Sequence, residues 1–322
     1  MLSLPDFREK NIVISFAAEG QSVSFKNDNL IVKDGDNKTI LQTSCYRIFC
    51  VIIVGGTTLT SGIIERSKKF GFSIYLLSYG LKPIGVWNSS AEGNFLLRQK
   101  QYQYNNNKIA LYLVKNKIQN QIFLLKSVRF KTNRVKDAIT SLESYVLKDE
   151  IELRSILGME GISSRVFFQA WFENLNWKGR KPRSKIDMTN TILDIGYTYI
   201  FYFIEAMLNL YGFDIYKGVY HTNFYQRKSL VCDIVEPFRC IIDRRVKSAY
   251  GLKQIQEKDF THSKGQWFLN IDQNKKYSQW IVKEILNYKE PIFQYIQEYY
   301  RAFMRNKPIE DFPMFQINQD EG

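Results

Sequence analysis

The sequence predicts an α+β protein in which an N-terminal β-rich domain is followed by a larger, all-helical C-terminal domain. Short β-branched and aromatic runs dominate residues 11–77, and helical periodicity begins at Phe95. A cluster of Pro, Gly, Asn and Ser separates the two patterns. The chain of 322 residues is therefore divided into a β-rich domain at 1–85, a linker at 86–94, a helical domain at 95–307 and a flexible tail at 308–322.

Strand-like runs bounded by turn residues fill the N-terminal part. The Asp-Gly-Asp-Asn segment at 34–37 indicates a turn between two of them. The Gly-Gly-Thr-Thr segment at 55–58 lacks the Lys of a phosphate-binding loop, so we interpret it as a turn before a helix at 59–70. The strands are expected at 11–16, 22–25, 29–33, 39–42, 46–54 and 73–77.

Apolar residues recur at helical spacing in the C-terminal part. The run at 192–211 approaches the length of a membrane span, but it contains Asp194 and Glu205. Both acids would destabilise a membrane helix, so a buried core helix is expected and no membrane association. Earlier in the chain, one face of a long helix or of a helix pair carries Leu97, Tyr104, Ile109, Leu113 and Ile118.

The chain is strongly basic, with a formal net charge of +13 and a pI near 9.4. Such a protein attracts polyanions, of which nucleic acid is the commonest and an acidic membrane surface is the rival. An AT-rich genome would also enrich Lys without any functional reason. The four cysteines form no C-x-x-C pair and no signal peptide is visible, which favours reduced thiols in the cytoplasm.

Two acids and a histidine stand out as candidate metal ligands. His221 is one of only two histidines, and the other, His262, is expected in an exposed loop. Asp233 and Glu236 have the i, i+3 spacing that places two carboxylates on one helix face. Glu160 precedes an amphipathic run and is expected at a helix start. Carboxylates with an imidazole suit Mg²⁺ or Mn²⁺, and Zn²⁺ accepts the same set.

Each of these features also has an ordinary structural explanation. An acid at a helix start can be a cap, and an acid pair can be a solvated face. A loop histidine often has no function. Spacing alone therefore leaves the three-ligand site open.

Several short motifs of the C-terminal half are weak one by one but form a specific pattern when taken together. They are Glu160-Gly161, Arg180-x-Pro182-Arg183, Asp187-x-x-Asn190-x-x-Leu193-x-x-Gly196-Tyr197, Gly218-x-x-His221 and Ser229-Leu230-Val231-x-Asp233-x-x-Glu236-Pro237-Phe238-Arg239. With Asn94-x-x-x-Arg98-x-x-Gln101 near the domain boundary, they resemble the CRISPR-associated integrase family, the universal first-numbered Cas protein. The resemblance covers about residues 10–300.

This resemblance implies a DNA endonuclease and integrase of spacer acquisition. It assigns Glu160, His221 and Glu236 as ligands of Mg²⁺ or Mn²⁺, with Asp233 as a supporting acid and Asn190 as a structural residue near the site. The implied reaction joins the 3′-hydroxyl ends of captured double-stranded DNA to the CRISPR repeat by transesterification. The implied assembly is a homodimer formed through the N-terminal domain, in a four-plus-two complex with the small second-numbered companion protein.

Clusters of basic residues are the candidates for DNA contacts, because Lys and Arg neutralise phosphates. Two alternatives remain open from the sequence. One is a general metal-dependent nuclease acting on branched or linear DNA, and the other is a DNA-binding scaffold with a vestigial metal site. The candidate DNA-binding residues are Arg180, Lys181, Arg183, Lys185, Arg239, Arg244 and Arg245.

Overall fold

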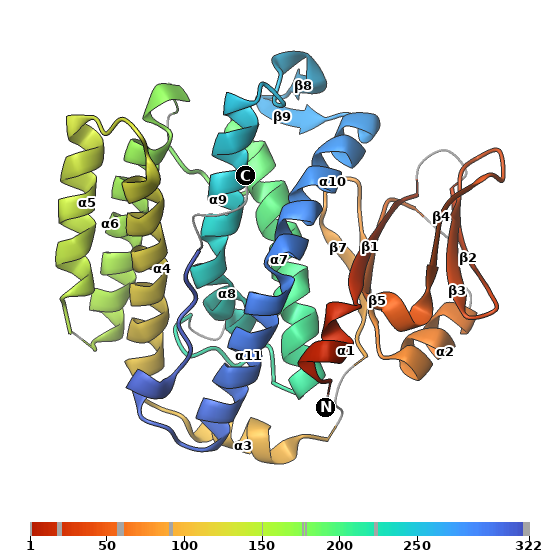
Figure 1. Ribbon diagram of the computed structural model, residues 1–322, viewed down its shortest axis with the longest axis horizontal. Helices are drawn as coiled ribbons and strands as arrows, with labels where there is room; N and C mark the ends of the chain where they lie inside the picture. Colours follow the sequence, from red (N-terminus) through yellow and green to blue (C-terminus); the bar gives the residue numbers. More distant parts are fainter. Residues whose placement is uncertain are drawn as a thin grey trace.

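Two β-sheets make up most of the N-terminal part of the computed structural model, which describes residues 2–17, 21–56, 61–89, 93–149, 151–175, 177, 179–221 and 225–317 (Figure 1). In the larger sheet, β1, β5 and β6 are parallel and β7 is antiparallel to β6. Its strands, in spatial order, are β1 (Asn11–Phe16), β5 (Ile48–Val54), β6 (Ser73–Leu77) and β7 (Pro83–Trp87). The smaller, antiparallel sheet contains β2 (Ser22–Lys26), β3 (Asn29–Lys33) and β4 (Thr39–Ser44).

Strand β5 is buried along its whole length because both of its faces are covered. Successive side chains of a strand point to opposite faces. Cys50 and Ile52 therefore join a core that includes the C-terminal helices, whereas Val51 and Ile53 join a smaller core with the second sheet. The larger sheet is thus packed directly against the helical part of the chain.

The predicted division into a strand-rich part and a helical part is confirmed. The predicted helix at 59–70 corresponds to α2 (Ser61–Phe70), which connects parallel strands β5 and β6 as such strands require. Residues 57–60 lie outside the described residues. The linker predicted at 86–94 is partly wrong, because residues 86 and 87 belong to β7 and pair with β6.

Helices form almost all of the C-terminal part. The apolar pattern starting at Leu97 belongs to a pair, since Asn105, Asn106 and Asn107 separate α3 from α4. The helices are α3 (Phe95–Gln103), α4 (Lys108–Ser127), α5 (Asn133–Val146), α6 (Leu153–Trp171), α7 (Met188–Tyr211), α8 (Ser229–Val235), α9 (Arg239–Gly251), α10 (Ile271–Asn287) and α11 (Lys289–Met304); a short α1 (Leu4–Arg8) precedes β1.

Helix α7 lies at the centre of the molecule, where it contacts β5 of the larger sheet and helices α8, α9, α10 and α11 (Figure 1). Asp187 caps its first turn by accepting the Asn190 N–H, and Gly212 ends it in a left-handed conformation with φ of 83°. Among the described helices only α7 is long and apolar enough to cross a membrane, and 83% of its most apolar window is buried within the protein. It is the buried core helix that the sequence predicted.

The expectation of an all-helical C-terminal domain is wrong at one place. β8 (Phe260–Ser263) and β9 (Gln266–Leu269) form an antiparallel hairpin after a 3₁₀ turn. Lys264 and Gly265 both have positive φ, as a two-residue hairpin turn requires. His262 is exposed as predicted, although it lies in β8 and not in a loop.

The tail predicted to be flexible is packed through residue 317, and we call residues 308–317 the C-terminal strap. Phe312, Phe315 and Ile317 are buried, so the strap contributes apolar area to the core. Asn116 of α4 pairs with the Phe315 backbone through hydrogen bonds of 2.7 and 3.0 Å. Asn120, one turn later, bonds to the backbones of Phe315 and Ile317 at 2.9 and 2.8 Å. Figure 1 shows the strap running back beside α4.

We predict that Phe315→Ala lowers the free energy of unfolding by about 3 kcal/mol, because the ring fills a buried site against Phe238. Urea unfolding followed by circular dichroism measures the change. Met314→Ala is the matched control, since the neighbouring Met314 is 44% exposed and its loss is expected to cost little. Equal stability of the Phe315 variant and the parent chain would show that the strap is not packed.

Candidate functional site

Two of the predicted ligands meet on a lysine that the sequence analysis did not single out. Glu160 comes from α6, Glu236 begins the 3₁₀ turn after α8, and Lys117 lies on α4. The Lys117 ammonium forms an ion pair with Glu160 Oε1, and its Nζ lies 2.7 Å from Glu236 Oε2. Glu160 stands in the middle of α6, so its predicted place at a helix start is wrong. The structure nevertheless brings these acids, 76 positions apart in the chain, to one point.

Glu236 is held in its ionised form. It is 6% exposed, and Arg239 Nε lies 3.0 Å from its other oxygen, Oε1. Burial alone would raise the pKa of the carboxyl, but the Arg239 and Lys117 cations outweigh burial and lower the pKa to about 2. Burial would likewise lower the pKa of Lys117, and the two carboxylates raise it instead. Both partners therefore carry full charges at neutral pH.

Asp233 positions His221 and does not point at the same place as Glu236. Its buried carboxylate accepts the backbone N–H groups of Val219, Tyr220 and His221 at 2.7–3.0 Å. Its Oδ1 also lies 2.6 Å from His221 Nδ1, which leaves Nε2 as the nitrogen able to coordinate. Although its i, i+3 spacing with Glu236 places the two acids on one helix face, the Asp233 carboxylate is occupied by the loop at 219–221.

Gly218 makes this arrangement possible. A Cβ atom at this position would lie 2.7 Å from Asp233 Oδ2 and 2.8 Å from the His221 carbonyl oxygen. Any side chain would therefore push the loop off the carboxylate that orients the histidine.

Tyr220 lies within the electrostatic influence of the acids among the predicted site residues. Its hydroxyl is buried and has no hydrogen-bond partner among the described residues. Burial raises the pKa of Tyr220, and the Glu160, Glu236 and Asp233 carboxylates raise it further. His221 in turn helps to lower the pKa of Glu236. The three carboxylates therefore lie within electrostatic reach of the Tyr220 hydroxyl, as His221 does of Glu236. We call the meeting point of Lys117, Glu160 and Glu236 the glutamate pocket.

The predicted ligands are of the chemical type that binds a hard divalent cation, but Lys117 stands between two of them. Two carboxylates, one imidazole and an unpaired hydroxyl are oxygen and nitrogen donors of the type that Mg²⁺ and Mn²⁺ accept. Within the described part of the chain, however, no three His, Cys, Asp or Glu side chains already stand close enough around one point to hold an ion. Lys117 lies between the two glutamates, so an ion that joins Glu160 Oε1 to Glu236 Oε2 would take the place of the ammonium.

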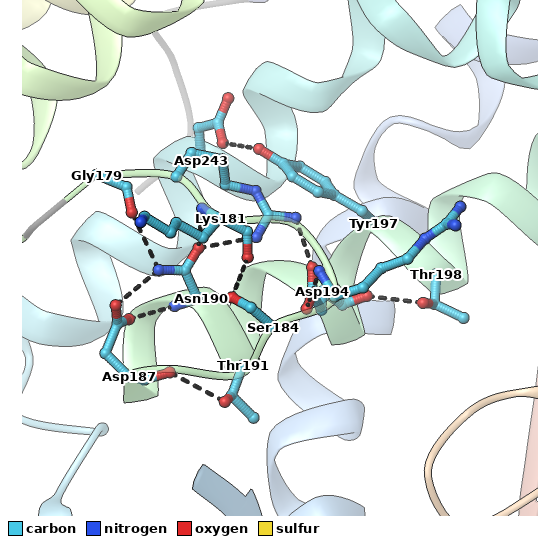
Figure 2. Close-up of polar contacts among 12 residues, drawn as sticks. Gly179, Lys181, Ser184, Asp187, Asn190, Thr191, Asp194, Tyr197, Thr198 and Asp243 are labelled. Atoms are coloured by element: carbon cyan, nitrogen blue, oxygen red, sulfur yellow. Dashed lines mark hydrogen bonds and ion pairs between the residues drawn. The ribbon is translucent and has the colours of Figure 1, made fainter. Parts of the chain in front are cut away.

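A polar network ties the basic loop at 179–185 to helix α7 (Figure 2). Arg180 donates to Asn190 at 3.0 Å and to Asp194 at 2.5 Å. Asn190 also accepts the Lys181 N–H and donates to the Gly179 carbonyl. Residues 179–181 thus fix the loop against α7.

Tyr197 connects this loop to the glutamate pocket. The Arg180 guanidinium lies 5.2 Å and the Arg239 guanidinium 4.6 Å from the Tyr197 ring centre. The Tyr197 hydroxyl donates to the buried carboxyl of Asp243, as Figure 2 shows. Because Arg239 is also paired with Glu236, the loop is linked to the pocket through a continuous series of contacts.

A family model described as CRISPR associated protein Cas1 matches residues 14–282 of this chain. The chain belongs to the Cas1 family. A CRISPR-associated endonuclease Cas1 of Thermodesulfovibrio yellowstonii is 30% identical over 255 residues, covering 73% of this chain and 80% of that protein. A Cas1 endonuclease of Rhodospirillum rubrum is 26% identical over 288 residues, covering 80% of this chain and 81% of the relative.

Solved structures of this fold extend over nearly the whole chain. A Cas1 protein from Thermotoga maritima has a TM-score of 0.77 at 16% identity, covering 91% of this chain and 97% of that one. A casposase bound to integration product has a TM-score of 0.76 at 19% identity, covering 97% and 96%. In a Cas6-RT-Cas1–Cas2 complex the TM-score is 0.81 at 22% identity, and this chain spans 36% of that longer one. The Cas1 fold therefore extends over nearly all of this chain.

Most of the basic residues predicted to bind DNA are engaged within this Cas1 chain. Arg244 bonds to Glu284 and Tyr288, and the Arg245 guanidinium stacks on Trp280 at 4.3 Å. The Lys185 ammonium lies 4.8 Å from the Phe268 ring centre. Arg180 and Arg239 are committed to the network described above.

Lys181 and Arg183 are the members of the predicted set that lie exposed. Arg183 has φ of 62°, a conformation that its N–H bond of 2.9 Å to Asp194 helps to hold. These two side chains are therefore the ones presented to a ligand in solution.

Lys117 and Tyr220 are the site residues that sequence reasoning missed. Lys117 follows Leu113 by four positions, so it falls on the apolar face of α4. A lysine on a buried helix face requires a charged partner, and this was the available signal. Tyr220 carried no such signal, because an aromatic residue beside a histidine is ordinary in a chain with 20 tyrosines.

We predict that Asp243→Asn reduces the pH dependence of stability. Burial, only partly opposed by the Tyr197 hydrogen bond and the Arg239 charge, raises the pKa of Asp243 from 3.8 to about 7. The neutral carboxyl is favoured by the fold, so the contribution of Asp243 to stability is fully present below about pH 4 and is lost as the pH rises through about 7. The asparagine stays neutral throughout.

Melting temperatures at pH 5.5 and pH 8 test this prediction. The parent chain should lose at least about 3 °C more than the Asp243→Asn variant over this interval. Asp137→Asn, an exposed change on α5, should follow the parent. An identical pH profile for the Asp243 variant would contradict the assigned protonation.

Proposed function

We propose that the chain is a metal-dependent DNA endonuclease and integrase of CRISPR adaptation. It joins the 3′-hydroxyl ends of captured double-stranded DNA to the CRISPR repeat. The observation that carries this proposal is the meeting of Glu160 and Glu236 on Lys117, in a chain of the Cas1 family whose His221 is oriented by Asp233. The related proteins named as Cas1 endonucleases support the DNA-cleaving part of the activity.

Glu160, His221 and Glu236 would hold Mg²⁺ or Mn²⁺. Such an ion, when bound, polarises a phosphate and favours the ionised form of a nearby hydroxyl. The chain contributes the rest through position and charge. Against the effect of burial, the Arg239 and Lys117 cations lower the pKa of Glu236 and favour its ionised form. Asp233 fixes the His221 ring so that Nε2 can coordinate. Tyr220 offers its hydroxyl as a donor inside the pocket.

The proposed joining step exchanges one phosphodiester bond for another. The 3′-oxygen of the captured DNA forms a bond to a phosphorus of the repeat, and that phosphorus loses its bond to the 3′-oxygen of the repeat strand. The proton of the attacking hydroxyl is finally balanced on the departing oxygen. Little general-base work is needed, because positioning and charge neutralisation dominate phosphoryl transfer.

The proposed assembly is a homodimer that joins the small companion protein Cas2 in a four-plus-two complex. Two of the similar folds come from complexes that contain both Cas1 and Cas2. In this chain the exposed Lys181 and Arg183, tied through Arg180 and Tyr197 to the glutamate pocket, would hold the DNA near the reacting phosphate.

We predict that Glu160→Gln, His221→Ala and Glu236→Gln each lower the rate of end joining at least about 100-fold, because each removes a donor while the fold is retained. A half-site integration assay with the companion protein, Mn²⁺ and a supercoiled CRISPR plasmid measures the joined strand. DNA affinity, measured in parallel by fluorescence anisotropy, should change little. Glu143→Gln, on the exposed face of α5, serves as the matched control.

The products separate the proposal from its alternatives. Joining by all three variants at the parental rate would show that this site is wrong. Cleaved but never joined strands from the parent chain would favour a general nuclease. Activity of neither kind would favour a DNA-binding scaffold.

We also predict that Lys181→Gln combined with Arg183→Gln reduces the salt dependence of DNA affinity. Two lost phosphate contacts should make the slope of log K against log salt shallower by about 2. Titrations between about 50 and about 200 mM salt measure this slope. Lys26→Gln combined with Lys38→Gln, exposed changes at the end of β2 and just before β4, provides an equal loss of charge. The same slope in both double variants would assign the 181–183 loop to solvent.

A further inference from the structure

The pocket that would hold the metal already contains a cation belonging to the protein. Lys117 is 7% exposed, and its ammonium is paired with both glutamates. A buried ammonium without partners would cost several kcal/mol, so the position is tolerated only because both carboxylates are there. Equally, two carboxylates facing one point repel each other unless a positive charge lies between them.

The charges in this pocket balance without any ion. Glu160 and Glu236 contribute two negative charges, and Lys117 and Arg239 contribute two positive charges. Asp233 is satisfied separately by the His221 loop. A divalent cation added to this arrangement would leave two uncompensated positive charges at close range, unless one of the protein's own cations moved away.

Of the two cations, Lys117 is the one that an entering divalent ion would displace. Arg239 is paired with Glu236 Oε1 and also stacks on Tyr197, so it is held on two sides. Lys117 Nζ lies 2.7 Å from Glu236 Oε2, yet this oxygen receives no aligned hydrogen bond from any described residue. If the ammonium leaves, Glu236 Oε2 loses its ion-pair partner, and Glu160 Oε1 keeps the hydrogen bond that it accepts from Ser164 Oγ at 2.9 Å. Both oxygens then have a lone pair available for an ion.

We propose that Lys117 is an internal counter-cation that holds Glu160 and Glu236 in place and competes with the divalent ion for them. The proposal rests on the metal-dependent function proposed above. It makes Lys117 a positioning residue that acts through the two glutamates. The ion binds by exchange with the ammonium and not by entry into a vacant cage.

A merely structural lysine and a competing lysine lead to opposite results for metal affinity. If Lys117 only supports the fold, its removal weakens every property of the pocket, metal binding included. If it competes with the ion, its removal lowers stability without metal but strengthens metal binding. Affinity for Mn²⁺ in the absence of DNA therefore separates the two roles without any measurement of activity.

The test compares Lys117→Met with the parent chain, using Mn²⁺ alone and the free-ion signal in electron paramagnetic resonance. The apparent Kd of the variant should be at least about tenfold lower. Without metal its melting temperature should fall below that of the parent, and saturating Mn²⁺ should close the gap. Lys115→Met is the matched control, because Lys115 lies on the same helix and pairs with Asp149, which is 86% exposed. Its Kd should equal that of the parent.

A second variant isolates the charge. Lys117→Arg keeps the positive charge, so its affinity for Mn²⁺ should stay close to the parental value. If Lys117→Met does not fold without metal, refolding on addition of Mn²⁺ supports the proposal, since the ion then replaces the ammonium. Failure to fold in saturating Mn²⁺ overturns it.

The remaining outcomes separate this proposal from the proposed function. If the parent binds Mn²⁺ and the Lys117→Met variant binds it equally or more weakly, the competing role is overturned and the metal-dependent function stands. If the parent and both Lys117 variants leave the Mn²⁺ signal unchanged, both proposals are overturned together.

Discussion

The ion pairs of Lys117 with Glu160 and Glu236 are the interaction on which the site depends. They connect α4, α6 and the turn after α8, three segments that are far apart in the sequence. The surrounding structure supports this meeting. Asp233 and Gly218 set the histidine loop beside it, and Arg239 completes the charge balance from the start of α9. The ion pairs thus hold the helices together and also form the candidate active site.

The fold was more predictable than the site, for a physical reason. Strand and helix periodicities are local, so β1, β3 and β6 fall where their residue patterns place them. The β8–β9 hairpin was missed because four-residue strands give too short a pattern. The strap was missed because position near the chain end said nothing about the burial of Phe315 and Ile317.

The order of the motifs along the chain was enough to predict the ligands Glu160, His221 and Glu236. It did not predict which groups these side chains and Asp233 contact. Asp233 and Glu236 have helical spacing in the sequence, but only the three-dimensional loop at 219–221 shows that Asp233 faces the backbone. The basic clusters were equally ambiguous. Arg180 and Arg183 look alike in the sequence, yet one is held by Asp194 and Tyr197 and the other lies exposed. A count of charges cannot distinguish a surface cation from one already paired inside the fold.

The asparagine clamp on the strap has a mechanical consequence. Asn116 and Asn120 grip the strap, and Lys117 lies between them on the same turn of α4. Tension applied to the strap is therefore delivered to the helical turn that carries the pocket's own cation. A displacement of the strap would therefore also shift the α4 backbone at Lys117, so the position of the strap and the position of the ammonium are coupled.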